Sequence, residues 1–175
     1  GMFISFDDGQ NWQSFQLNLP TTPITDLKVY HQDLVVATQG RAFWIMDDIT
    51  PLHQISDNTA SNQLVLYKPG EAYRTQVSGY QGENAPQNRP KGALIHYYLA
   101  QATDSLSLEI LDDEGRLVQQ FNSYESPDRL ETTSGAHRFV WDLTYPKPTL
   151  IDGAVMSLSY TGGPKAPTGM YTLRL

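Results

Sequence analysis

Short apolar and β-branched stretches alternate with turn-forming residues along the whole chain. The first 48 residues hold five such stretches, at residues 2–6, 12–17, 24–30, 34–38 and 42–46. Gly, Pro, Asn, Asp and Gln separate them, as is typical of strands joined by turns. No window keeps apolar residues at the i, i+3, i+4 and i+7 spacing over the roughly ten residues that a helix needs. We therefore expect the first part of the chain to be a meander of antiparallel strands.

The remaining chain continues the strand pattern. Residues 93–99 form an unbroken apolar run of strand length, which is typical of a central strand. Residues 105–110 alternate polar and apolar, and the turn 112–115 leads to a return strand at 116–121. Further strands are predicted at residues 64–67, 72–73, 137–143 (with Phe139 and Trp141 on one face) and 170–175, and a long loop at 76–92. Short strands with turns between them predict a β-sandwich.

Composition and charge narrow the classes of function. The 175 residues carry a net charge of −7, with 39% hydrophobic and 18% charged residues, which is typical of a folded domain and not of a disordered chain. The acidic balance argues against a nucleic-acid partner. No run of about 18 apolar residues occurs, so no membrane span is expected. The absence of Cys excludes disulfides, thiolate metal sites and a Cys nucleophile.

The acidic charge is concentrated in the first part of the chain. Residues 1–60 hold seven acids against two bases, whereas residues 61–175 hold twelve acids against ten bases. Residues 56–62 are all small or polar, as is typical of a linker. We therefore predict one domain at residues 1–55, a linker at 56–62 and a second domain at 63–175.

One motif is specific. Residues 5–12 fit the Asp-box pattern Ser-x-Asp-x-Gly-x-x-Trp through Ser5, Asp7, Gly9 and Trp12, with Asn11 where Thr is usual. A short carboxylate in a turn accepts hydrogen bonds from the turn's own amides, glycine permits a positive φ, and a tryptophan packs beneath the turn. We therefore expect these four residues to stabilise the fold and not to catalyse a reaction.

On this motif and on residues 24–27, 33–41 and 43–48, the chain resembles the last propeller strands of the Asp-box (bacterial neuraminidase repeat) proteins. The likeness is to the sortilin-like group that is often labelled glycosyl hydrolases. Residues 108–118, 137–143 and 166–175 resemble the immunoglobulin-like domain that follows the propeller, which is akin to that of flagellar hook-capping proteins.

The resemblance implies an all-β fold, in which an immunoglobulin-like β-sandwich is preceded by a short antiparallel sheet from an incomplete propeller blade. It also implies an upstream propeller as a partner within a longer protein and a secreted or periplasmic location. The family's second domain normally continues past the last strand seen here, so we expect a closing hairpin beyond residue 175.

The chain lacks the residue patterns that catalytic and metal sites need. A sialidase binds its substrate's carboxylate with an arginine cluster, but residues 1–60 contain a single Arg. The acid pairs Asp7–Asp8, Asp47–Asp48 and Asp112–Asp113 offer the carboxylates of a glycosidase. They lie at predicted turns, however, and are interpreted as solvated turn acids. The four histidines lack metal spacing, and residues 112–115 lack the alternating ligands of a calcium loop. No catalytic residue, metal or cofactor is therefore predicted.

The sequence thus predicts a non-catalytic structural or interaction module. The alternative is a carbohydrate-binding module, or part of a glycosidase that acts on extracellular glycans. Tyr80 and Tyr124 are then the candidates to stack on sugar rings, although tyrosine is common in sandwich domains. Because one blade cannot bury both of its faces alone, apolar residues such as Phe43, Trp44 and Ile45 need cover. That cover is expected from the sandwich or from a homodimer formed through residues 2–48.

Overall fold

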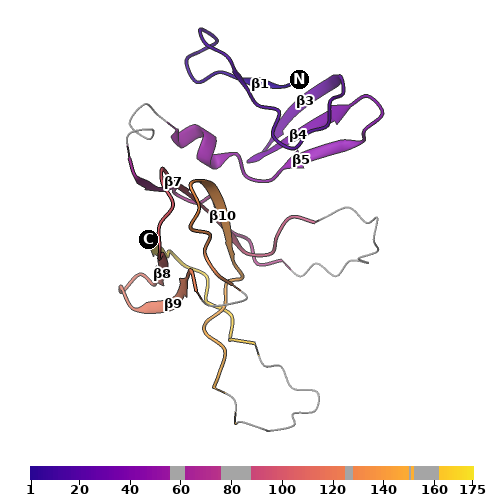
Figure 1. Ribbon diagram of the computed structural model, residues 1–175. Helices are drawn as coiled ribbons and strands as arrows, with labels where there is room; N and C mark the ends of the chain where they lie inside the picture. The colour runs from indigo at the N-terminus through magenta and orange to yellow at the C-terminus, as the bar shows by residue number, and fades with distance from the viewer. Residues whose placement is uncertain (56–61, 76–87, 125–127, 150, 152–161) are drawn as a thin grey trace. The chain divides into compact units, whose positions relative to one another are not determined.

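The computed structural model describes residues 1–55, 62–75, 88–124, 128–149, 151 and 162–175 (Figure 1). The chain is nearly all β, which confirms the predicted fold class. In the part that is described, the only helical element is a single 3-10 turn, η1 (Thr50–Gln54). The chain divides into two compact units, one made of Gly1–Ser61 and Lys68–Gly70 and the other of Asn62–Tyr67 and Glu71–Leu175.

The first unit contains two antiparallel sheets, so the pairing expected for residues 2–48 is divided between them. Strands β1 and β2 pair with each other, and β3, β4 and β5 form a meander in chain order, as predicted. The strands are β1 (Phe3–Ile4), β2 (Gln13–Ser14), β3 (Ile24–Tyr30), β4 (Asp33–Thr38) and β5 (Phe43–Met46).

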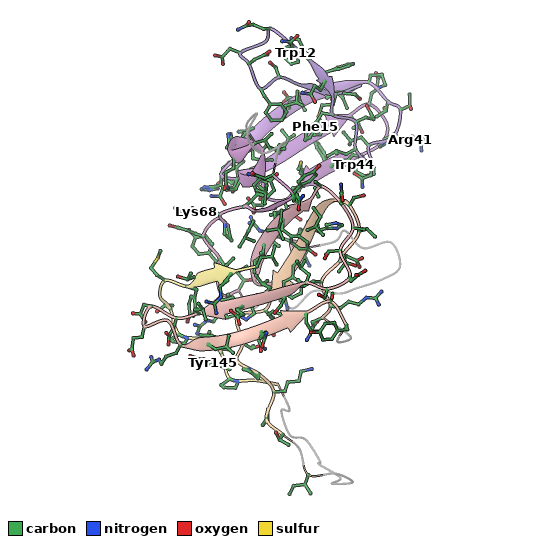
Figure 2. All side chains as sticks on the ribbon, turned by 60° about the vertical axis from the view of Figure 1, so that its left-hand side comes forward. Trp12, Phe15, Arg41, Trp44, Lys68 and Tyr145 are labelled. Atoms are coloured by element: carbon green, nitrogen blue, oxygen red, sulfur yellow. The ribbon has the colours of Figure 1, made fainter. Side chains whose placement is uncertain are left out.

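Local hydrogen bonds fix the hairpin between β4 and β5. The amide and the hydroxyl of Thr38 both donate to the carbonyl oxygen of Ala42, at 3.3 and 2.6 Å. Gly40 takes up the turn with a φ of 79°. The indole of Trp44 donates to the carbonyl oxygen of Arg41 at 2.9 Å, and Figure 2 shows the two side chains close together. These contacts set the register in which β5 lies against β4.

The second unit contains two three-stranded antiparallel sheets. Their strand orders are β10-β7-β6 and β11-β8-β9. The strands are β6 (Leu64–Leu66), β7 (Ala93–Leu99), β8 (Ser107–Leu111), β9 (Leu117–Asn122), β10 (Gly135–Trp141) and β11 (Thr172–Arg174). Strand β7 is the central strand of its sheet, which confirms the prediction from its unbroken apolar run.

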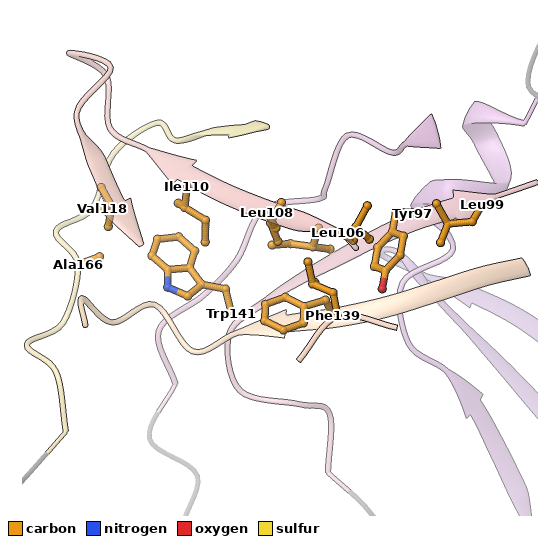
Figure 3. Close-up of a cluster of buried hydrophobic side chains, with 11 residues drawn as sticks. Tyr97, Leu99, Leu106, Leu108, Ile110, Val118, Phe139, Trp141 and Ala166 are labelled. Atoms are coloured by element: carbon orange, nitrogen blue, oxygen red, sulfur yellow. The ribbon is translucent and has the colours of Figure 1, made fainter. Parts of the chain in front are cut away.

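Both sheets of the second unit contribute to one hydrophobic core. Figure 3 shows Phe139 and Trp141 of β10 facing Leu108 and Ile110 of β8. Leu108 and Ile110 are completely buried, as the alternating pattern predicted. The rings of Phe139 and Phe121 lie 4.6 Å apart between their centroids and connect β10 to β9. The unit is therefore held by two apolar sheet faces that pack against each other.

Polar atoms of the large aromatic core residues have partners. The hydroxyl of Tyr97 donates to the carbonyl oxygen of Glu131 at 2.8 Å, and the indole of Trp141 donates to that of Thr144 at 3.0 Å. Burial raises the pKa of the Tyr97 hydroxyl, so it stays protonated at neutral pH. These bonds let amphipathic rings occupy the core without leaving a donor unpaired.

Two predicted features differ from the structure or lie outside it. Residues 72–73 were predicted to be a strand, but they are irregular, and Tyr73 is 71% exposed. A two-residue stretch between Pro69-Gly70 and a polar segment offers too little apolar surface to hold a strand in place.

The linker residues 56–61 and most of the predicted loop, residues 76–87, lie outside the described residues. The domain boundary and the immunoglobulin-like topology stay predictions. No helix in the described ranges is long and apolar enough to cross a membrane.

Candidate functional site

Residues 5–12, where the sequence predicts an Asp box, form a turn between β1 and β2 that is held by side-chain hydrogen bonds. The hydroxyl of Ser5 donates to one carboxylate oxygen of Asp7 at 2.8 Å and accepts the amide of Gly9 at 2.8 Å. Asn11 donates twice to Asp7, from its backbone amide at 2.8 Å and from its side-chain amide at 2.5 Å. The carboxylate of Asp7 therefore accepts three hydrogen bonds from its own turn.

Gly9 and Trp12 complete the same turn. Gly9 has a φ of 87°, in the left-handed region that favours glycine, and it follows Asp8, whose φ is 55°. The indole of Trp12 donates to the carbonyl oxygen of Gly9 at 3.0 Å. The ring lies against the turn but is not buried, since 63% of Trp12 is exposed. Asn11 supplies two of the donors to Asp7 and so takes a direct part in the turn.

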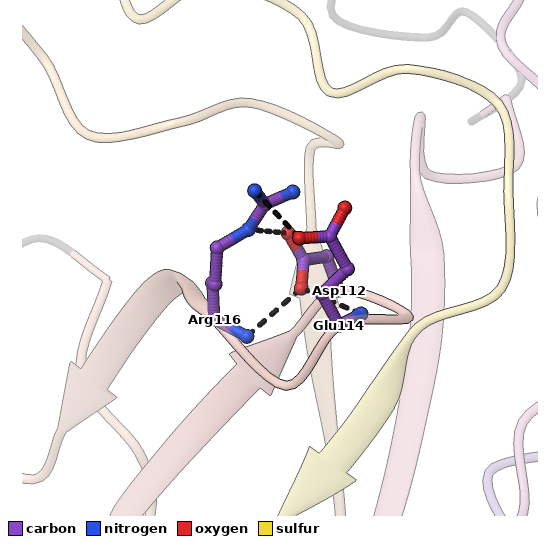
Figure 4. Close-up of polar contacts among 3 residues, drawn as sticks. All are labelled: Asp112, Glu114 and Arg116. Atoms are coloured by element: carbon purple, nitrogen blue, oxygen red, sulfur yellow. Dashed lines mark hydrogen bonds and ion pairs between the residues drawn. The ribbon is translucent and has the colours of Figure 1, made fainter.

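A second turn in the other unit uses the same device. Between β8 and β9, one carboxylate oxygen of Asp112 accepts the amides of Glu114 and Arg116 at 3.0 and 2.8 Å. Its other oxygen accepts the Nε of Arg116 at 2.9 Å, as Figure 4 shows. Gly115 again supplies the positive φ, 77°. The sequence indicated a hairpin turn here but not that Asp112 holds it. In both turns an aspartate accepts the amide four residues ahead, with a glycine between them.

These contacts change the acidity of both aspartates in the same direction. The backbone amide of Asn11, followed by its side chain and by Ser5, lowers the pKa of Asp7 below its ordinary value. The backbone amide of Arg116 and then its guanidinium lower the pKa of Asp112. Hydrogen bonds to the ionised form are the cause in both cases. A general acid of a glycosidase needs a raised pKa, so neither carboxylate is suited to that role.

The third acid pair departs from the sequence prediction. Asp47–Asp48 was interpreted as a pair of solvated turn acids, but Asp48 is only 2% exposed. Its carboxylate accepts the amide of Thr50 at 3.0 Å, and its own amide donates to the carboxylate of Asp33 at 3.0 Å. Asp48 thus connects the end of β5 to the start of the 3-10 turn. Burial in a turn needs no apolar pattern, so hydrophobic periodicity gave no sign of it.

A shallow apolar cleft lies beside the turn formed by residues 5–12. Its volume is about 370 Å³, and it is lined by Gly1, Met2, Phe3, Trp12, Ile24 and Leu27. Most of these residues are apolar, and the Trp12 indole nitrogen already donates to Gly9. The cleft therefore offers surface for an apolar contact but no converging polar groups of the kind that orient a small substrate.

Of the two candidate sugar-contacting tyrosines, Tyr124 is the one that lies in the described part of the chain. Tyr124 follows β9, is 74% exposed, and has its amide bonded to the side chain of Asn122 at 3.1 Å. Its ring contacts no other aromatic ring among the described residues. Tyr80 lies outside the described residues. The described part of the chain also holds no group of three or more His, Asp or Glu able to bind a metal ion.

The β3–β4–β5 sheet carries apolar side chains on both faces. One cross-strand row is Leu27, Val36 and Trp44, and the next row, on the opposite face, is Lys28, Val35 and Ile45. Leu27 is 50% exposed on the first face, and Ile45 is 61% exposed on the second. When one face of an antiparallel sheet is exposed to solvent, that face normally carries polar side chains. The sequence had already indicated this surface through the apolar residues of β5.

Comparisons of the chain with protein-family models, with curated proteins and with solved structures find no match.

Proposed function

We propose that the chain is a non-catalytic structural or interaction module of an Asp-box repeat protein of the sortilin-like, glycosyl hydrolase-labelled group. Residues 1–55 then supply strands of a propeller blade, and residues 63–175 form an immunoglobulin-like sandwich. The observation that carries the proposal is the use of the Asp7 carboxylate, which accepts three hydrogen bonds within its own turn.

The two-faced sheet of the first unit supports the same proposal. Blades of a propeller pack against neighbours on both sides, so their strands carry apolar residues on both faces. The β3–β4–β5 sheet has this pattern, with Val29 58% exposed on one face and Phe43 75% exposed on the other. An upstream propeller in a longer protein supplies the missing neighbours in this proposal, and a secreted or periplasmic location goes with it.

The second candidate function is glycan binding, and the exposure of Tyr124 is the observation that favours it. An aromatic ring presented at a strand end is suited to stacking on a sugar. Tyr80 belongs to the same candidate set from the sequence.

A glycan array and a panel of chromogenic glycosides, both applied to the 175-residue chain, test the proposal. We expect neither binding nor hydrolysis above the signal of heat-unfolded protein. Binding that is lost in Tyr124→Ala but kept in Tyr73→Ala, an equally exposed control, would favour the glycan-binding function instead. Hydrolysis that is abolished by Asp7→Asn or Asp112→Asn would overturn the non-catalytic reading.

A further inference from the structure

The outer edge of strand β5 presents backbone groups that can pair with another strand. Within the described residues β5 pairs only with β4, and it ends the β3–β4–β5 sheet (Figure 1). The amide of Thr38 donates to the carbonyl oxygen of Ala42. Thr38 and Ala42 are therefore a hydrogen-bonded pair, and every second residue of β5 after Ala42 directs its backbone groups toward β4. The backbone groups of Ala42 and Trp44 therefore face β4, and those of Phe43 and Ile45 face outward from the edge.

Strand β5 lacks the features that usually keep a further strand from pairing with a sheet edge. Residues 43–46 of β5 contain no charge, proline or glycine and pair with β4 without a register shift, and the left-handed φ of 61° at Ala42 lies just before the strand. Natural edges are protected by charges, prolines or bulges. The opposite edge, β3, has such protection, with Lys28 in its middle and a bulge between Ile24 and Asp26. The two residues of β5 with outward-facing backbone groups are also apolar and well exposed, Phe43 at 75% and Ile45 at 61%.

We propose that β5 pairs antiparallel with β5 of a second copy of this chain, which joins the two β3–β4–β5 sheets into one sheet of six strands. The charges at the ends of the strand suit this partner. Arg41 precedes β5 and Asp47 follows it, so an antiparallel pair brings the basic end of each copy beside the acidic end of the other.

One register satisfies the backbone and the charges together. Only Phe43 and Ile45 have outward-facing backbone groups within β5, so they must occupy the hydrogen-bonded positions of the new ladder. Placing Phe43 opposite the partner's Ile45 uses both residues of both copies. It also brings Arg41, in the turn before β5, to the same end of the pair as the partner's Asp47, and this happens twice. A slip of two residues in one direction places Phe43 opposite the partner's Asp47, and a slip in the other direction places Ile45 opposite the partner's Arg41. Either slip exchanges an ion pair for an apolar residue facing a charge.

The dimer goes beyond the proposed function and does not depend on it. A monomeric chain would remain a non-catalytic module, and a dimeric chain could still bind glycans. The outcome on oligomeric state is therefore separate from the outcome on the glycan array.

Sedimentation velocity of the 175-residue chain over about a hundredfold range of concentration is the first test. We expect a reversible monomer–dimer equilibrium. Ile45→Lys places a charge at the centre of the new ladder and should raise the dimer dissociation constant at least about tenfold. Val29→Lys is the matched control, since Val29 is similarly exposed (58%) but lies on β3, and it should leave the constant within about threefold.

A charge exchange tests the register. Arg41→Asp and Asp47→Arg chains should each dimerise weakly alone, because like charges meet at both ends. An equimolar mixture of the two should form a heterodimer, since each exchanged charge then meets its opposite. A monomer at every concentration, an equal loss in Val29→Lys, or no heterodimer from two folded variants would overturn the proposal. If either charge variant fails to fold by circular dichroism, the comparison of Ile45→Lys with Val29→Lys decides the outcome.

Discussion

Replacing Ile110 by alanine measures directly how strongly the core of the second unit depends on contact between its two sheets. Ile110 is completely buried on β8, between Leu173 of β11 and Gln119 of β9. The substitution removes three buried carbon atoms, which costs about 2.4 kcal/mol at roughly 0.8 kcal/mol each. The cavity that remains adds to this cost, so we expect a total loss of about 3 to 4 kcal/mol in the free energy of unfolding.

The assay is urea denaturation followed by tryptophan fluorescence. The chain has three tryptophans, and changing Trp12 and Trp44 to phenylalanine leaves Trp141 as the reporter of the second unit. Leu117→Ala is the control on neighbouring β9, where Leu117 is 54% exposed and should cost about 1 kcal/mol or less. A loss for Ile110→Ala that is no larger than the control's would show that the two sheet faces do not pack as described.

Three further predictions concern backbone strain, acid stability and a buried hydroxyl. Gly92→Ala should lower the free energy of unfolding of the second unit by more than about 2 kcal/mol in the same urea assay. Gly92 has a φ of 133°, and a Cβ there would lie 2.0 Å from the carbonyl oxygen of Trp141 in β10. Gly169→Ala, with no atom within 4 Å of its added Cβ, should be tolerated. The folded state lowers the pKa of Asp112, so its contribution to stability is present above the unfolded pKa of about 3.9 and is lost as the pH falls through the folded pKa. Unfolding midpoints measured from pH 6 to about pH 2 should therefore fall less steeply in Asp112→Asn than in the parent chain. Tyr97→Phe removes a 2.8 Å hydrogen bond to a backbone carbonyl and should cost about 1 kcal/mol in thermal unfolding; no change would show that the bond adds nothing.

Strands with strong local patterns could be predicted from the sequence. β3 was expected at residues 24–30 and is observed at Ile24–Tyr30, and the apolar run 93–99 matches β7 in both bounds and central position. Apolar alternation also placed Leu108 and Ile110 in the core. In these segments, periodicity, turn residues and burial all favour the same structure, so local reasoning was sufficient.

Features that depend on particular side-chain hydrogen bonds could not be predicted in the same way. The stretch at 12–17 was expected to be one strand, but β2 ends at Ser14. One further ladder bond joins the amide of Phe15 to the carbonyl oxygen of Met2 at 2.8 Å, and Leu17 then turns away with a φ of 46°. Burial of Asp48 depends on bonds to Asp33 and Thr50, which leave no trace in hydrophobic periodicity. The Asp-box spacing was visible in the sequence, whereas the two donors that Asn11 supplies to Asp7 required coordinates.

The most direct test of the central claim, that Ser5 and Asp7 are used to hold the turn between β1 and β2, is the hydrogen exchange of the Gly9 and Asn11 amides by NMR. Both amides donate to side chains of the motif, Gly9 to Ser5 and Asn11 to Asp7, each at 2.8 Å. We expect both to be protected in the parent chain and in Asp8→Asn, and the Asn11 amide to lose its protection in Asp7→Ala, which has no side-chain acceptor. Exchange of both amides at free-peptide rates in the parent chain would contradict the claim.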